Sequence, residues 1–220
     1  MKEISIYKSE KKNLTNKVFC VGQNFALHIE EMKSKVSEFP IVFLKPNTAI
    51  ITTGENILIP NISKNPQQEV ELVTVIGKSG KNILETNAEN FIFGYAVGFD
   101  ITLRDLQLEA KKNGHPWTIA KGFDTSSPIS EIVPKEFFKN KEIEFFCSIN
   151  GIEKQRGKST DMIYSISKII SYISKFFTLE VGDLIFNGTP SGISTISNDD
   201  ILRAEIVGFT QTQNKVIIEK

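Results

Sequence analysis

The run from Gln68 to Gly77 (QEVELVTVIG) places the strongest constraint on how this chain can fold. It is dense in β-branched residues and ends on a glycine, a composition that predicts a β-strand. Alternate side chains of a strand point to the same face, so Glu69 and Glu71 should lie side by side. Neighbouring carboxylates repel each other, and on a covered face each also loses its hydration. The pair therefore requires either open water or a cation.

A second predicted strand, over residues 93–99, delivers another acid, Asp100, directly after its apolar run. Three carboxylates suit a hard divalent ion such as Mg²⁺ or Mn²⁺, because zinc prefers cysteine and histidine. Arg104, Gln107 and Lys121 follow within a short stretch. The pattern indicates an oxygen-ligand metal site beside an anion-binding pocket, with an ordinary solvated strand face as the alternative.

Charge and composition exclude several classes of protein. Among the 220 residues, 26 Lys and Arg balance 26 Asp and Glu, and no basic block suggests nucleic acid. No apolar run reaches membrane-spanning length, and the first residues lack the apolar centre of a signal peptide. Cys20 and Cys147 lie in apolar strand-like runs, which favours reduced, buried thiols over a catalytic one. We expect one domain over residues 1–220 and a cytoplasmic location.

The segment after Gly22 has a helical pattern that begins near Asn24, a plausible N-cap, with apolar residues at positions 25, 29 and 32. On such a helix His28 and Glu31 are three residues apart and share a face. A carboxylate beside a histidine fixes the ring tautomer and raises its basicity, an arrangement used for proton transfer. The alternative is an exposed histidine with an incidental acid.

The remaining elements point to a mixed α/β, mostly β fold, because strand patterns outnumber helical ones throughout. Residues 103–112 read as a helix, residues 150–151 as a hairpin turn, and the longest helix is predicted over residues 160–177. The loop 187–192 offers backbone N–H groups and the Thr189 hydroxyl, which suit a carboxylate. For Trp117, packing beneath a loop is favoured over a place in a substrate wall.

Several short motifs in this order resemble the fumarylacetoacetate hydrolase family, in particular its short, single-domain, acylpyruvase-like members. The motifs stand at 21–25 with 28 and 31, 43–46, 69–71 with 75–78, 94–95, 100–107, 121–124, 182–183 and 188–190. The resemblance implies a fumarylacetoacetate hydrolase-like β-roll or barrel with few helices. It also implies that two copies of the protein form a homodimer. Finally, it implies a hydrolase that cleaves a C–C bond in 3-acylpyruvates or related 2,4-dioxo acids.

The resemblance implies further roles for the acids and for the helical pair. Glu69, Glu71 and Asp100 would hold one Mg²⁺ or Mn²⁺, which would chelate a 2-oxo acid. His28 and Glu31 would lie on a lid helix that covers the substrate and activates a water. The metal would act as a Lewis acid toward the chelated substrate.

The same resemblance implies that Lys121 stabilises a developing enolate and that Gln107 helps to place water or substrate. Arg104 and Thr189 would contact the substrate carboxylate. Gln23 would also contact the substrate; many relatives carry arginine there, and because glutamine keeps hydrogen bonding but lacks the charge, the resemblance does not define the distal contact or the far group of the substrate.

Other activities fit the same set of residues. An oxaloacetate decarboxylase or tautomerase, or a 2-oxo acid isomerase, would use the same metal site. A non-catalytic relative that only binds a 2-oxo acid is a further alternative. In every case the expected partner is a small-molecule 2-oxo acid, without nucleic acid or membrane.

Overall fold

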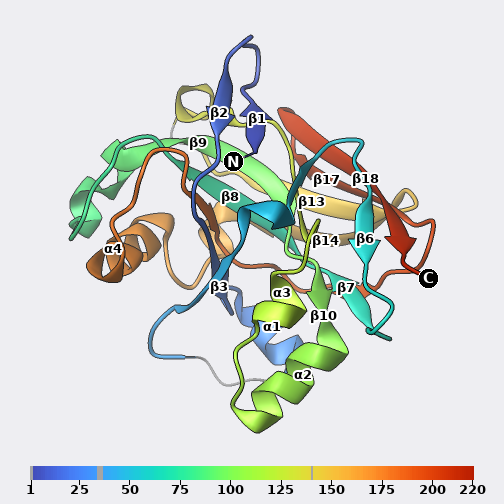
Figure 1. Ribbon diagram of the computed structural model, residues 1–220. Helices are drawn as coiled ribbons and strands as arrows, with labels where there is room; N and C mark the ends of the chain where they lie inside the picture. Colours follow the sequence, from blue (N-terminus) through green and yellow to red (C-terminus); the bar gives the residue numbers. More distant parts are fainter. Residues whose placement is uncertain (1, 34–36, 140) are drawn as a thin grey trace.

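The computed structural model describes residues 2–33, 37–139 and 141–220. It is a mostly β structure in which curled sheets carry few helices, as the sequence predicts (Figure 1). The largest sheet has eight strands. In spatial order they are β4 (Ile41–Lys45), β3 (Val18–Gly22), β15 (Leu184–Phe186), β8 (Val70–Ile76), β9 (Ile92–Phe99), β11 (Ser127–Ile129) and β5 (Ile50–Thr52), with β12 (Val133–Pro134) paired to β9.

Three smaller sheets complete the β structure. The five-stranded sheet consists of β14 (Ile152–Lys158), β13 (Glu144–Ile149), β17 (Ile201–Ile206), β18 (Thr210–Ile218) and β6 (Ile57–Ile59). The three-stranded sheet consists of β10 (Thr102–Leu103), β7 (Pro66–Gln68) and β16 (Ser194–Thr195). Strands β1 (Glu3–Ser5) and β2 (Lys12–Leu14) form a separate pair.

Both faces of the large sheet are covered, which explains the continuous apolar runs of its central strands. All seven residues of β8 are buried. Alternate residues of β3 enter two different hydrophobic clusters: Phe19 and Val21 belong to one, and Val18 and Cys20 to the other. A strand buried on both sides has no polar face, so its sequence is apolar throughout instead of alternating.

The helices are α1 (Ala26–Glu31), α2 (Arg104–Asn113), α3 (Thr118–Lys121) and α4 (Ile166–Phe176), with 3₁₀ turns η1 (Asn47–Ala49), η2 (Glu85–Phe91), η3 (Lys135–Phe137) and η4 (Ser159–Asp161). Figure 1 shows α1, α2 and α3 gathered at the lower end of the molecule near β10, while α4 lies apart from them. None of the helices in the described part of the chain is long and apolar enough to cross a membrane.

Several elements agree with the sequence predictions. Helix α2 ends at Gly114, whose φ of 68° is the left-handed conformation that glycine adopts most readily. Asn150 and Gly151 connect β13 to β14 with positive φ angles at both positions, as in a type I′ hairpin. Both cysteines are free and buried.

The start of the longest helix differs from the prediction. Residues Ser159–Asp161 form only a 3₁₀ turn, and the α-helix begins at Ile166. The Ser165 side chain accepts a hydrogen bond of 3.1 Å from the backbone N–H of Lys168, which is the N-cap arrangement. The true N-cap therefore lies inside the segment that had been predicted as helix.

Candidate functional site

The three predicted metal ligands converge because β8 and β9 pair in antiparallel register. Glu69 precedes β8, Glu71 lies on it, and Asp100 follows β9. The pairing of β8 with β9 is extended by a hydrogen bond of 2.8 Å from the Asp100 backbone N–H to the Glu69 carbonyl. All three side chains are buried, and one carboxylate oxygen of each lies within 4.8 Å of the others. The alternative of a solvated strand face for the two glutamates is therefore wrong.

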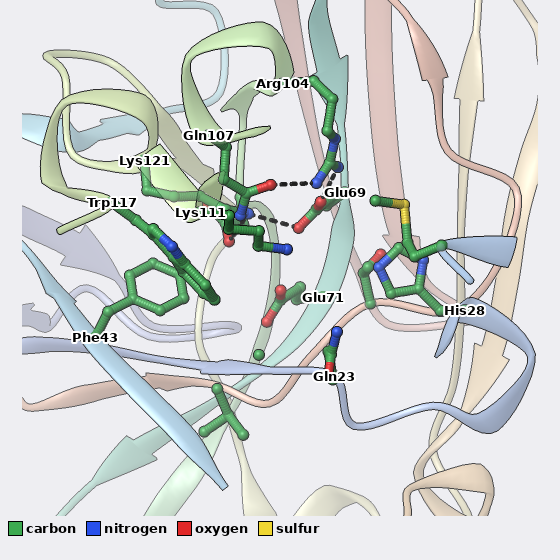
Figure 2. A pocket seen from close by; sticks show the side chains of 15 residues that line it. Gln23, His28, Phe43, Glu69, Glu71, Arg104, Gln107, Lys111, Trp117 and Lys121 are labelled. Atoms are coloured by element: carbon green, nitrogen blue, oxygen red, sulfur yellow. Dashed lines mark hydrogen bonds and ion pairs between the residues drawn. The ribbon is translucent and has the colours of Figure 1, made fainter. Parts of the chain in front are cut away.

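Two cations from the neighbouring helices face these acids. The Lys121 ammonium, at the end of α3, lies 2.7 Å from both Glu69 Oε2 and Asp100 Oδ2. Arg104, at the start of α2, donates hydrogen bonds to Glu69 and, at 2.6 Å, to Gln107 Oε1 (Figure 2). Arg104 and Gln107 share one face of α2, as their spacing predicts.

A third cation, Lys45 on β4, contacts the acids as well; the sequence analysis placed it in one of the family motifs but predicted no role for it. Its ammonium lies 2.7 Å from Asp100 Oδ1 and donates to the Ser126 carbonyl at 3.0 Å. The Lys45 side chain is fully buried. A lysine in a short strand is ordinary in sequence, and its partner lies far along the chain, so no local pattern could identify the pair.

The electrostatic environments of the two glutamates differ. Burial disfavours ionisation of Glu69, but the charges of Lys121 and Arg104 outweigh it and lower the pKa of Glu69 well below its usual range. Burial, together with the charges of Asp100 and Glu69, raises the pKa of Glu71 well above its usual range. The backbone N–H of Gly188 donates to Glu71 Oε2 at 2.6 Å but does not offset these effects.

This charge distribution fits a divalent cation. Glu71 is the acid whose negative charge is least compensated, and a cation within reach of all three carboxylates would favour its ionised form. The donor set consists of carboxylate oxygens alone, which Mg²⁺ and Mn²⁺ prefer. The residues present are therefore suited to hold either ion.

The predicted pair of His28 and Glu31 is formed on α1. His28 Nδ1 lies 3.1 Å from Glu31 Oε2, and the imidazole is buried at the edge of the pocket. Glu31 also accepts a hydrogen bond of 3.1 Å from the backbone N–H of Gly192. The carboxylate is thus held in place while it orients the ring.

Asn24 does not cap α1, contrary to the prediction; the N-cap position is Phe25 and has no side-chain cap. The Asn24 amide instead donates to the carbonyls of Tyr164 (3.1 Å) and Asn187 (2.8 Å) and accepts from the Tyr164 N–H (2.7 Å). These bonds join the start of α1 to the segment before α4 and to the residue that follows β15. The Asn24 side chain therefore makes tertiary contacts in place of a helix cap.

The loop that follows β15 directs its donors at carboxylates of the protein itself. The N–H groups of Gly188 and Gly192 bond Glu71 and Glu31 respectively. The Thr189 hydroxyl accepts a hydrogen bond of 2.8 Å from Gln155 on β14, whose Oε1 in turn accepts from the Val70 N–H at 2.9 Å. Gln155, which the sequence analysis did not single out, therefore fixes this loop against β8.

A small cavity of about 30 Å³ lies among these groups. It is lined by nine of the ten predicted site residues: Gln23, His28, Glu69, Glu71, Asp100, Arg104, Gln107, Lys121 and Thr189. The tenth, Glu31, does not line the cavity but contacts the ring of His28, which does. Phe43, Lys111 and Trp117 also line it, although none of the three was predicted to do so.

Trp117 forms part of the wall, so the favoured expectation that it only packs beneath a loop is wrong. Its ring meets that of Phe43 edge-on, with centroids 5.8 Å apart (Figure 2). Each ring also lies close to a lysine ammonium, that of Lys111 over Trp117 and that of Lys121 over Phe43. The wall is thus apolar but favourable to positive charge.

Comparisons with known proteins agree with this architecture. The model of the family described as fumarylacetoacetate (FAA) hydrolase C-terminal matches residues 17–217. The chain is 44% identical over 200 residues to the mitochondrial oxaloacetate tautomerase of Mus musculus, covering 90% of each chain. It is 41% identical over 204 residues to an uncharacterised protein of Pyrococcus abyssi, covering 92% of this chain and 91% of the other.

Among solved structures, a fumarylpyruvate hydrolase from Pseudomonas aeruginosa in complex with Mn²⁺ and pyruvate superposes with a TM-score of 0.94 at 33% identity. The match covers 99% of this chain and 96% of that one. A 5-carboxymethyl-2-hydroxymuconate delta-isomerase from Mycobacterium smegmatis matches with a TM-score of 0.84 at 33% identity, over 95% and 81% of the two chains. The buried carboxylate cluster, the fold and the extent of these matches lead to one conclusion: the chain belongs to the fumarylacetoacetate hydrolase family.

Proposed function

We propose that this protein is a metal-dependent enzyme that interconverts the keto and enol forms of oxaloacetate. The observation that carries the proposal is the buried set of Glu69, Glu71 and Asp100 with the Lys121 ammonium beside it. Relatives that align over about nine tenths of the chain are named oxaloacetate tautomerases, from mammals to Arabidopsis thaliana. This activity was the alternative, not the first choice, of the sequence analysis.

The reaction moves one proton between carbon and oxygen. When the enol forms, a proton leaves C3 of oxaloacetate, its electron pair enters the C2–C3 bond, and the carbonyl oxygen gains negative charge and then a proton. Mg²⁺ or Mn²⁺, held by the three acids, would supply Lewis acidity toward that oxygen. Lys121 and Arg104 would supply further positive charge in a largely buried site, where it is most effective.

His28 is the candidate for the proton transfer at C3. Its Nδ1 is engaged by Glu31, which leaves Nε2 to accept or return a proton. General acid–base catalysis of this kind contributes about 10²–10⁴-fold to a rate. We therefore expect His28→Ala to lower turnover by about 100-fold or more while leaving Mn²⁺ binding intact.

The test is the ultraviolet absorbance of the enol of oxaloacetate, followed with purified protein in Mg²⁺, in Mn²⁺ and in EDTA. Pyruvate is measured in the same samples, because its formation would report decarboxylation instead. Metal-dependent equilibration of the two forms without pyruvate supports the proposal. Equilibration at the rate of the protein-free control contradicts it.

Hydrolysis of an acylpyruvate remains the second candidate, because the His28–Glu31 pair is intact and a fumarylpyruvate hydrolase shares the fold. In that reaction water adds to the acyl carbon, and the C–C electron pair leaves as the enolate of pyruvate. Acetylpyruvate tests it: metal-dependent release of acetate and pyruvate would support a hydrolase. Its absence together with enol formation would favour the tautomerase.

Location and assembly stay predictions. The mammalian relatives are named as mitochondrial proteins, so their names do not support the cytoplasmic location expected here. The homodimer is likewise a proposal, which light scattering during gel filtration would test.

A further inference from the structure

Lys111 stands on the pocket side of α2, one helical turn beyond Gln107. Arg104, Gln107 and Lys111 are spaced i, i+3 and i+7, so they share one helix face, and all three line the cavity. Figure 2 shows the Lys111 side chain reaching into the same space as Glu69 and Glu71. The residue as a whole is solvent-exposed, which places it at the mouth of the pocket.

The other cations of the site already face carboxylates. Arg104 and Lys121 contact Glu69, and Lys45 contacts Asp100. Among the salt bridges of the described residues, none includes Lys111; its ammonium lies instead over the Trp117 ring, 4.8 Å from the centroid. A positive charge at the pocket mouth is thus available to a ligand.

The surroundings of Lys111 favour an anion at that point. Partial desolvation, with the charges of Arg104 and Lys121, lowers the pKa of Lys111. A carboxylate placed against the ammonium would offset this repulsion and accept up to three hydrogen bonds from it. The Lys111 ammonium already lies over the Trp117 ring, so less side-chain freedom would be lost on binding.

We propose that Lys111 binds the second carboxylate of a dicarboxylic 2-oxo acid, and that the site therefore prefers such diacids over 2-oxo acids that carry one carboxylate. This inference rests on the proposed function, since it assumes that the 2-oxo carboxylate end of the substrate lies at the acid cluster. The distal carboxylate then faces α2 and Trp117, where Lys111 is the cation without a carboxylate partner among the described residues.

The test compares oxaloacetate with its 4-methyl ester, which keeps the carbon chain but lacks the distal charge. The proteins compared are the wild type, Lys111→Met, Lys111→Arg and Lys112→Met. Lys112 is the matched control, because it is an exposed neighbour on the same helix that does not line the pocket. Dissociation constants with Mn²⁺-loaded protein and kcat/KM are both measured.

The wild type should prefer the diacid by about tenfold or more, the strength of a hydrogen bond to a charged group. Lys111→Met should abolish this preference by raising KM and the dissociation constant of the diacid toward those of the ester. Lys111→Arg should retain most of the preference, and Lys112→Met all of it. Equal binding of the two compounds by the wild type, or an equal loss for both in Lys111→Met, overturns the inference.

The two proposals can fail separately. If the wild type binds the diacid more tightly and Lys111→Met removes the difference, but no protein forms enol, the proposed function fails and the inference stands. If enol forms, but wild type and Lys111→Met handle oxaloacetate and its ester at the same rates, the proposed function stands and the inference fails.

Discussion

Glu71→Gln should stabilise the metal-free protein and, at the same time, abolish its stabilisation by metal. Glu71 is buried beside two other carboxylates, which raises the pKa of its side chain. The folded state therefore tends to hold a proton that the unfolded state has released at neutral pH, and ionising Glu71 in the folded protein costs free energy. Glutamine removes this cost, and its amide oxygen can still accept from the Gly188 N–H.

The metal-dependent part of the effect can be given a size. A ligand at a hundred times its dissociation constant stabilises the folded state by about 2.7 kcal/mol. For a chain of this length, 1 kcal/mol shifts the melting temperature by about 2–4 °C. The wild type should therefore gain about 5–11 °C from Mn²⁺ at that concentration, and Glu71→Gln close to none.

Differential scanning calorimetry in EDTA and in Mn²⁺ measures both effects, after calorimetric titration has given the dissociation constant. Glu109→Gln is the matched control, because this acid lies exposed on α2 and does not line the pocket. It should melt like the wild type under both conditions. If Glu71→Gln kept the full Mn²⁺ shift, or melted below the wild type in EDTA, the reasoning about this carboxylate would be refuted.

Three further predictions follow. Lys45→Met leaves Asp100 with only one of its two buried cations, Lys121. The free energy of unfolding, measured by urea titration, should fall by about 3 kcal/mol. A loss below the error of measurement would show that the Lys45–Asp100 pair does not stabilise the fold. Burial raises the pKa of Cys147 to about 12 and that of Cys20 well above its usual value, so neither thiol should react with a disulfide reagent at pH 8 until the protein is unfolded. The unfolded state releases these protons first, so both thiols should make stability fall as the pH rises through about 9, which urea titrations at pH 8 and pH 10 would detect. Finally, His28→Ala should keep the Mn²⁺ dissociation constant within about twofold, because its ring is not among the oxygen ligands; loss of Mn²⁺ binding would exclude the role in proton transfer.

The acids of the site could be predicted because their signal is local. A strand composition fixes the face on which Glu69 and Glu71 lie, and Asp100 follows directly after the next strand. The mostly β architecture was likewise predictable, since short apolar runs separated by turn residues specify strands.

The cations around the acids were harder to assign because their partners are set by tertiary structure. Lys45 has no local partner in the sequence until β4 is placed beside the site, and Lys111 is one of two adjacent lysines near the end of a helix. Errors at element ends have the same origin. Asn24 has the chemistry of an N-cap, but the Tyr164 backbone and the Asn187 carbonyl compete for its side chain and prevail.

The position of β15 has a consequence for how the protein is made. This strand comes late in the chain, yet it lies in the interior of the large sheet, parallel to β3 and antiparallel to β8. A nascent chain that lacks it leaves both neighbours with unpaired edges and the acid cluster without the Gly188 N–H. The part of the chain before β15 therefore cannot complete the site during synthesis, and the site forms only after the residues through Gly192 have left the ribosome.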